Sequence, residues 1–120
     1  NDIVDNAFAG VTIRSQGNPK LLRNRIRSNK RIGVWVYDNG QGLIEDNNIS
    51  GNLYTGVEIN TGGNPILCRN RINKNGCHAI CVHKDGAGIF EDNDLRGNSQ
   101  GAWDIFADHA LKLVRERNLE

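Results

Sequence analysis

The sequence predicts an all-β fold, a right-handed parallel β-helix of about five 23-residue coils closed by a C-terminal cap. Three observations support this prediction. Asn recurs every 23 residues in two columns, apolar residues recur at the same period, and apolar and polar residues alternate within each copy as they do in strands. Copies this small must stack to bury a core, and a strand spacing of about 4.8 Å gives a rod roughly 24 Å long.

Five copies of the repeat follow one another without a gap. The Asn columns have a structural explanation, because Asn tolerates the left-handed conformation of sharp turns and stacked amides can hydrogen-bond as a ladder. We therefore assign these ten Asn residues to the structure and not to a ligand. The recurring positions are Asn1, Asn24, Asn47, Asn70 and Asn93; Asn6, Asn29, Asn52, Asn75 and Asn98; Ile3, Ile26, Ile49, Ile72 and Leu95; Gly10, Gly33, Gly56, Ala79 and Ala102; Val11, Val34, Val57, Ile80 and Trp103; Ile13, Val36, Ile59, Val82 and Ile105; and Leu21, Ile44, Leu67, Phe90 and Leu113.

A leucine-rich repeat is the main alternative, because its length range includes 23 residues. Counting back from Asn29, its pattern requires apolar residues at 26, 24 and 21. The sequence has Ile26 and Leu21 but Asn24 between them, and that position is Asn in every copy. No segment before the C-terminal tail has a helical period that could form the convex side. The β-helix is therefore favoured.

Charged residues alternate between copies just before the first Asn column, in the order Arg23, Asp46, Arg69, Asp92 and Arg115. In register, each Arg lies between acidic neighbours, which fixes the register of the stack. The pairs Glu45-Asp46 and Glu91-Asp92 resemble paired catalytic carboxylates. We instead assign Asp46 and Asp92 to the charge column and expect Glu45 and Glu91 to be solvated.

Four segments carry the repeat most clearly: GNPKLLRNRI, GVWVYDNGQGLIEDNNISGN, GNPILCRNRI and FEDNDLRGNSQGAWDI. They resemble the pectin-lyase-like parallel β-helix repeats of F-box ubiquitin-ligase adaptors and of many bacterial multidomain proteins. In the F-box proteins such repeats are taken to recognise the protein that is ubiquitinated, and related repeats occur in carbohydrate-binding proteins and sugar hydrolases. The chain shows no F-box segment, so the resemblance implies the fold and not the ligase role.

The strand that follows the small residue offers the best outward face. Its outward side chains form two columns, and we predict that Trp35 and Tyr37 are exposed there and stack on a sugar ring or anchor a peptide. An alternative is that another segment or a sister chain covers these aromatics. The predicted binding residues are Trp35, Tyr37, Arg14, Glu58, Asn60 and His83, within the columns Thr12, Trp35, Glu58, Cys81, Asp104 and Arg14, Tyr37, Asn60, His83, Phe106.

Cys and His are the usual ligands of zinc, and they cluster in the segment CHAICVH. Ile80 and Val82 are core positions, so Cys81 and His83 point the same way from one strand while Cys77 lies in the preceding bend. A tetrahedral site would require that bend to fold back. The sequence therefore indicates no metal and no cofactor, with Cys68, Cys77 and Cys81 as free thiols.

The composition limits the classes of partner. The formal net charge of +1 does not favour nucleic acid, and no apolar run is long enough to span a membrane. Three Cys favour a reducing compartment, so we predict a cytoplasmic protein. The start at Asn1 without Met predicts a fragment of a larger protein, and the ending GAWDI followed by a drifting copy predicts a natural C-terminus near Glu120.

The predicted organisation is a five-coil β-helix over residues 1–107, followed by a capping strand or short helix over 108–120. Trp103 is expected to seal the last complete coil. We predict a non-catalytic recognition or scaffold module that binds a protein or glycan partner. One alternative is a polysaccharide lyase or glycosidase, for which Glu58 and Asp104 lie about 9.6 Å apart by strand spacing. The other is a structural rod that pairs end to end through an uncapped N-terminal coil.

Overall fold

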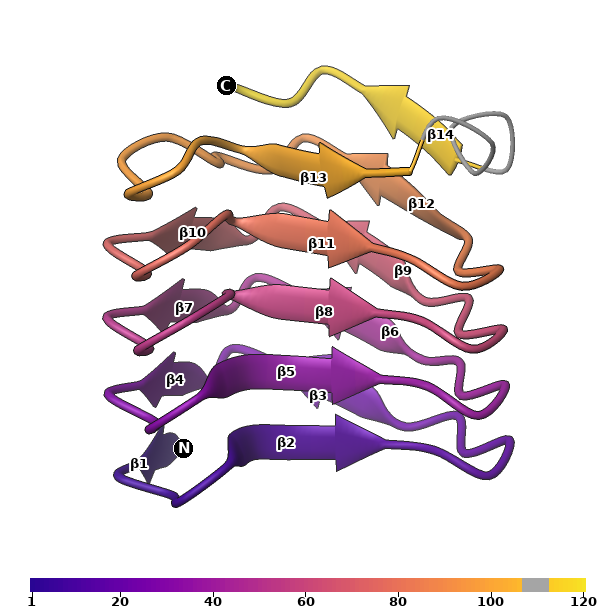
Figure 1. Cartoon of the computed structure of the whole chain (residues 1–120), viewed down its shortest axis with the longest axis horizontal. Coiled ribbons are helices and arrows are strands. Elements are labelled where there is room, and N and C mark those ends of the chain that lie inside the picture. Colours follow the sequence, from indigo (N-terminus) through magenta and orange to yellow (C-terminus); the bar gives the residue numbers. More distant parts are fainter. Residues whose placement is uncertain (107–112) are drawn as a thin grey trace.

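The computed structural model describes residues 1–106 and 113–120. These residues form strands and no helices, and the coils stack one above another from the N-terminal end of the rod to the C-terminal end (Figure 1). All strand pairs are parallel. The predicted all-β parallel solenoid is thereby confirmed.

Three parallel sheets run along the rod, and each of the first four coils contributes one strand to each sheet in turn. The fifth coil contributes strands to the second and third sheets and meets the first sheet only through an isolated bridge between Asp94 and Arg71. The first sheet contains β1 (Asp2–Val4), β4 (Arg25–Arg27), β7 (Asn48–Ser50) and β10 (Arg71–Asn73). The second contains β2 (Ala9–Ile13), β5 (Ile32–Val36), β8 (Val57–Ile59), β11 (Ile80–Val82) and β13 (Trp103–Ile105). The third contains β3 (Lys20–Leu22), β6 (Leu43–Glu45), β9 (Ile66–Cys68), β12 (Gly88–Glu91) and β14 (Leu113–Glu116).

The strand register follows the 23-residue period, so each inward apolar column becomes a stack of like side chains. Ile26, for example, pairs with Ile3 below it and with Ile49 above it. Ile26 and Ile49 are completely buried, as are the corresponding residues of the second and third sheets in the middle coils. The core is therefore a continuous apolar column between the three sheets.

Both predicted Asn columns form buried ladders. In the second ladder, the Asn52 side-chain oxygen accepts hydrogen bonds from the backbone N and the side-chain Nδ2 of Asn29, at 3.1 and 2.9 Å. Asn52 Nδ2 in turn donates to the Asn75 side-chain oxygen at 2.9 Å. The middle Asn side chains of each ladder are buried, and their polar atoms are hydrogen-bonded. The ladders therefore stabilise the bends, where the strand pairing of the sheets would leave buried polar groups without a partner.

The prediction that these Asn residues themselves take the left-handed conformation is wrong. The positive φ falls on the residue just before each ladder Asn, as at Ser28 (57°) and Lys74 (57°). The sharp corner is made there, and the Asn that follows is free to direct its amide inward into the ladder. At the other ladder the corner residues form the charged column, Arg23, Asp46, Arg69, Asp92 and Arg117.

A small residue is needed where the chain leaves the bend that carries the second Asn ladder and enters the second sheet. A Cβ on Gly56 would lie 2.4 Å from Cγ2 of Ile72 and 2.9 Å from Nδ2 of Asn75. Such contacts are far inside van der Waals distance, so a larger side chain would push the ladder away from the core.

The last coil contains two residues more than the others, which corrects the prediction of five ungapped copies. β14 pairs with β12 at a shift of 25, so Phe90 lies beside Arg115 and not beside Leu113. The first Asn ladder continues to Asn118, whose side-chain oxygen accepts from Asn93 N at 3.0 Å. Arg117 consequently takes the place in the charged column that the sequence analysis gave to Arg115.

The two ends of the rod differ. At the C-terminal end, Trp103 packs edge-on against Phe90 at 5.3 Å, and the Arg115 guanidinium lies 5.2 Å from the Trp103 ring. Residues 108–112 of the predicted cap lie outside the described residues, and within the described part, 113–120, Leu113–Glu116 form β14. In the N-terminal coil, Ile3 and Val11 are only partly buried. End-to-end pairing through that coil stays a prediction.

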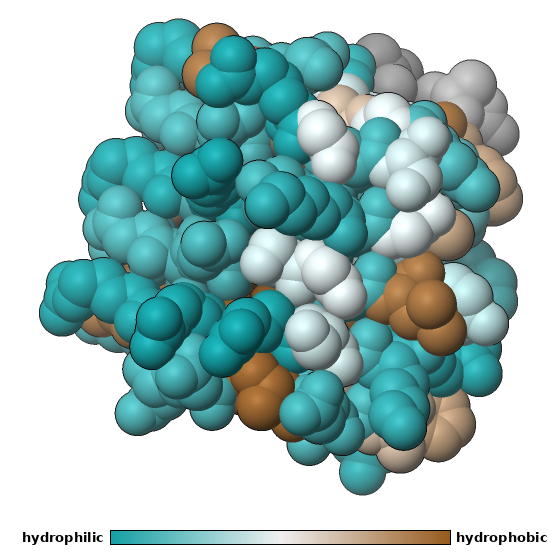
Figure 2. Space-filling model, turned by 90° about the vertical axis from the view of Figure 1, so that its left-hand side faces the viewer, coloured by the Kyte–Doolittle hydropathy of each residue, from teal (hydrophilic) through white to brown (hydrophobic). Residues whose placement is uncertain are grey.

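The side of the rod formed by the bends between the first and second sheets is mainly hydrophilic, with small separate hydrophobic patches (Figure 2). Among the described residues, Phe8, Leu53 and Tyr54 belong to these bends and expose 64, 59 and 44% of their surface. No helix that is long and apolar enough to cross a membrane occurs in the described part of the chain.

Candidate functional site

The outward face of the second sheet carries the predicted site residues. Register places Trp35 beside Thr12 and Glu58, and Cys81 between Glu58 and Asp104. The predicted column therefore exists as a continuous row of side chains across five coils. Its members differ in chemistry from one coil to the next, whereas the inward residues of the same strands are all apolar.

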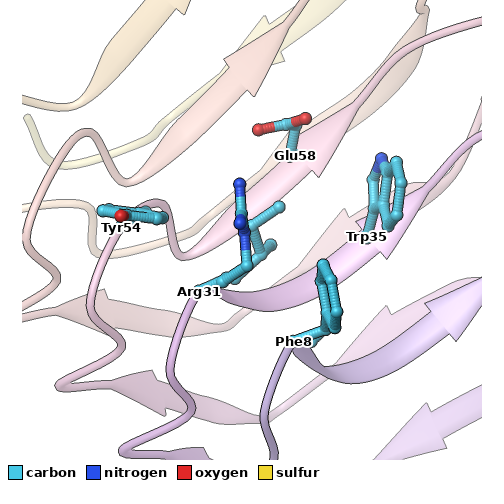
Figure 3. Close-up of a pocket in the computed structure, with 7 residues that line it drawn as sticks. Phe8, Arg31, Trp35, Tyr54 and Glu58 are labelled. Carbon is cyan, nitrogen blue, oxygen red and sulfur yellow. The ribbon is translucent and has the colours of Figure 1, made fainter.

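An aromatic hollow occupies the part of this face nearest the N-terminal coils. Trp35 and Tyr37 stack on each other with ring centres 4.2 Å apart, and both are half-buried and not exposed as predicted. Trp35 also lines a hollow of about 180 Å³ together with Phe8, Arg31, Tyr54 and Glu58 (Figure 3). The Arg31 guanidinium lies 5.3 Å from the Phe8 ring and 5.4 Å from the Tyr54 ring.

Sequence reasoning missed Phe8, Arg31 and Tyr54, although they carried a usable signal. The three residues are spaced at the 23-residue period and lie in the bend just before the second sheet. Stacking of the coils places the three side chains in a row beside Trp35 and so widens the predicted site toward the bends.

Glu58 is the acidic group of the hollow and is about half-buried. Burial raises the pKa of its carboxyl, while the nearby positive charges of His83 and Arg31 act in the opposite direction. Asn60 Nδ2 donates a hydrogen bond to the Glu58 carboxylate at 3.2 Å. Glu58 can therefore accept hydrogen bonds at the edge of the aromatic surface.

A separate polar cluster forms on the fourth and fifth coils of the same face. His83 Nε2 lies 3.2 Å from Cys81 Sγ and 3.2 Å from Asp104 Oδ2, and the Cys81 Sγ to Asp104 Oδ2 distance is 3.5 Å. The His83 ring stacks on Phe106 with centres 4.0 Å apart. Asp104 lies in the predicted column beside Cys81, and its contact with His83 was not predicted.

This cluster does not have the geometry of a Cys-His-Asp catalytic triad. In a triad the two imidazole nitrogens face different partners, whereas the nearest nitrogen to both Cys81 Sγ and Asp104 Oδ2 is Nε2 of His83, with Nδ1 3.8 Å from the sulfur. Cys81 is also 5% exposed, and burial, followed by the charges of Asp104 and Glu58, raises the pKa of its thiol. The thiol is therefore protonated at neutral pH and is a poor nucleophile.

The structure divides the six predicted binding residues into neighbouring groups. Arg14 Nη1 donates a hydrogen bond to the Tyr37 hydroxyl at 3.3 Å, at the edge of the stacked aromatic pair. Glu58 and Asn60 form a second group beside the hollow. His83 belongs to the cluster with Cys81 and Asp104. Their common role in binding stays a prediction.

The charged column is more extensively paired than the sequence indicated. Arg69 contacts both Glu45 and Asp46, and Arg117 lies 3.8 Å from Glu91 and 2.8 Å from Asp92. The expectation that Glu45 and Glu91 are simply solvated is therefore wrong. Because each Arg side chain reaches back over the coil below, it meets both carboxylates of the Glu-Asp pair.

The fold and this face define the class of protein as a parallel β-solenoid with a repetitive interior and a varied outward surface. The family model described as "Right handed beta helix region" matches residues 1–116, and the chain belongs to that family. No curated protein matches the chain, and no solved structure matches it either. Family membership identifies the fold, and the function has to be inferred from the face itself.

Proposed function

We propose that this chain is a non-catalytic recognition module that binds a protein partner on the outward face of its second sheet. The observation that carries the proposal is the aromatic hollow, where Phe8, Trp35 and Tyr54 surround Arg31. Trp, Tyr and Arg are the residues most enriched at the energetic centres of protein interfaces. A hollow of about 180 Å³ is smaller than the pocket of a typical drug-sized ligand and suits one anchoring side chain.

The size and shape of the face support a protein partner. The face that carries β5 and β8 is turned toward the viewer in Figure 1. The two longer extents of the molecule, 32 and 29 Å, lie in the plane of this view. Each partner in a standard interface buries about 800 Å². Phe8 and Tyr54 expose 64 and 44% of their surface, so the aromatic edges are accessible to a partner.

The test is a binding selection with two kinds of library. The whole chain is presented to a displayed library of peptides and to a glycan array, and the variants Phe8→Ala and Trp35→Ala are compared with the wild type. We expect peptide ligands whose affinity falls by about 10-fold or more in both variants. The matched control is Ile66→Ala, because Ile66 is an exposed apolar residue on the third sheet, and this variant should bind as the wild type does.

Three outcomes would contradict the proposal. Selection of glycans without peptides would assign the face to carbohydrate recognition. Equal binding by wild type and both aromatic variants would place the interface elsewhere. No ligand from either library would remove the recognition role.

The raised pKa of Glu58 supports a second candidate function, a sugar hydrolase or lyase. A half-buried carboxyl beside aromatic rings has the character of a general acid. Its partner in the column, Asp104, lies two coils away and is engaged with His83. Release of reducing sugar from acidic polysaccharides, lost in Glu58→Gln, would support this alternative over the first.

A further inference from the structure

Three different metal-ligand atoms meet on the outward face where β11 and β13 pair. Cys81 Sγ, His83 Nε2 and Asp104 Oδ2 all lie within 4.8 Å of one another. Their separations, 3.2, 3.2 and 3.5 Å, describe a nearly regular triangle. Tetrahedral zinc with ordinary bond lengths to sulfur, nitrogen and oxygen would hold these atoms about 3.4–3.6 Å apart. Each observed separation is within about 0.4 Å of that requirement.

The backbone holds this triangle in place. Cys81 and His83 are two residues apart and lie on the same side of the chain at β11, because Val82 between them is completely buried in the core. Asp104 is the register partner of Cys81 on β13. The His83 ring is held by its stacking on Phe106, at an interplanar angle of 10°. Little rearrangement is needed for the three atoms to share one ion.

We propose that Cys81, His83 and Asp104 form a zinc-binding site that links the fourth and fifth coils. Thiolate, imidazole and carboxylate are the three kinds of ligand that Zn²⁺ takes in proteins. Three protein ligands leave a fourth position for water or for a group from a partner. The site does not depend on the proposed recognition function, because it lies beyond the aromatic hollow along the same column.

A shared cation would replace the hydrogen bonds that the three side chains make with one another. Both the sulfur of Cys81 and the carboxylate oxygen of Asp104 lie 3.2 Å from Nε2 of His83, and the sulfur also lies 3.8 Å from Nδ1. A second carboxylate lies nearby, because Glu58 is the register partner of Cys81 on its other side. Zn²⁺ would bind at Nε2, take up the thiolate of Cys81 with release of its proton, and neutralise the surrounding carboxylates.

The test uses the full chain, reduced and treated with a chelator. Zn²⁺ is titrated in competition with a chromophoric chelator, and Co²⁺ is used as a spectroscopic probe of the same site. We expect one equivalent of metal per chain, a thiolate-to-cobalt charge-transfer band, and release of about one proton per Zn²⁺ at neutral pH. Ions held only by surface carboxylates would give neither the band nor the proton.

Matched variants locate the site. Cys81→Ser should abolish the charge-transfer band, and both Cys81→Ser and Asp104→Asn should lower zinc affinity at least about 10-fold, the lower end of what loss of an outer-shell partner costs. Cys68→Ser is the control, because Cys68 is a free thiol on the third sheet, and it should bind zinc as the wild type does. Circular dichroism verifies folding, and Asp104→Asn carries the test if Cys81→Ser does not fold.

Three results would overturn the proposal. The first is a wild type that fails to bind one equivalent of Zn²⁺ or Co²⁺, and the second is a cobalt band that persists in folded Cys81→Ser. Loss of the band in Cys68→Ser would also refute it, since the thiolate ligand would then be on another sheet.

Discussion

Alternate residues of the second sheet face opposite sides of the same strands, yet they follow different patterns along the rod. The inward residues repeat, as in Val34, Val57 and Ile80, and all three are completely buried. The outward residues at the intervening positions change from Trp35 to Glu58. An inward side chain must fit against its own copy above and below, so stacking requires repetition. An outward side chain is free of this requirement, so variation there indicates where binding chemistry can be placed.

The largest expected effect comes from breaking the interior ladder. In Asn75→Ala, the backbone N and the Nδ2 of Asn52 lose their shared acceptor, which lies at 3.0 and 2.9 Å. Buried donors left without a partner cost about 1–3 kcal/mol each, so the loss of two should lower the free energy of unfolding by about 2–6 kcal/mol. Urea unfolding measures the change. Asn64→Ala, at an exposed turn position, is the control and should change it by less than about 0.5 kcal/mol.

The apolar interior should be nearly as sensitive, whereas the outward row should not. Ile59 is completely buried, and Ile59→Ala should lower the free energy of unfolding by about 2–4 kcal/mol through lost burial and a residual cavity. Thr12→Ala, at an exposed outward position, should alter it by less than about 0.5 kcal/mol. Similar losses in the two variants, measured by thermal and urea unfolding, would remove the distinction between the two faces.

Glu58 tests whether a half-buried carboxylate on the varied outward face lowers the free energy of unfolding. Burial raises the pKa of this carboxyl above its ordinary value of 4.5, so the folded protein favours the protonated form. Stability gained from protonation at low pH is therefore lost as the pH rises through the folded-state pKa. Glu58→Gln cannot ionise and should be more stable than the wild type at pH 7, with the difference disappearing at pH values below 4.5. An advantage that is equal at both pH values would refute this explanation.

The smallest effect is expected at the charged column. Arg69 is exposed and contacts Asp46 at 3.3 Å and Glu45 on the coil below. Arg69→Gln should lower the melting temperature slightly at low ionic strength and not measurably in high salt, because solvent and salt screen exposed ion pairs. A loss that persists in high salt would mean that Arg69 stabilises the corner by packing and not by charge.

The repeat made most of the fold predictable from the sequence. A period of 23 residues fixed the strand register, the inward columns and the two Asn ladders, since every coil provides the same side chain for the next one. The extra two residues of the last coil were missed because the repeat drifts there. Arg117-Asn118 reproduces the pair Arg23-Asn24 and was the signal that could have revealed the shift.

The candidate site was predicted only in part. Trp35 and Glu58 follow from alternation along a strand, which decides the side of the sheet on which a residue lies. Phe8 and Tyr54 lie in bends, where alternation gives no direction, so their approach to Trp35 was visible only in the folded coils. The left-handed conformation falls on the residue before each ladder Asn and not on the Asn itself. The hydrogen bonds of the ladder decide this, and the conformational preference of the residue types does not.

The sequence by itself determined the period, the inward and outward assignment of each strand residue, and the composition of every column. The tertiary structure alone decided which side chains of neighbouring columns and coils meet. The repeat already places Asp104 beside Cys81 in one column, but only the folded coils show that His83, from the neighbouring column, meets both side chains. Repetition makes the distance between equivalent residues predictable, whereas contacts between different columns depend on how the bends and rotamers place each side chain.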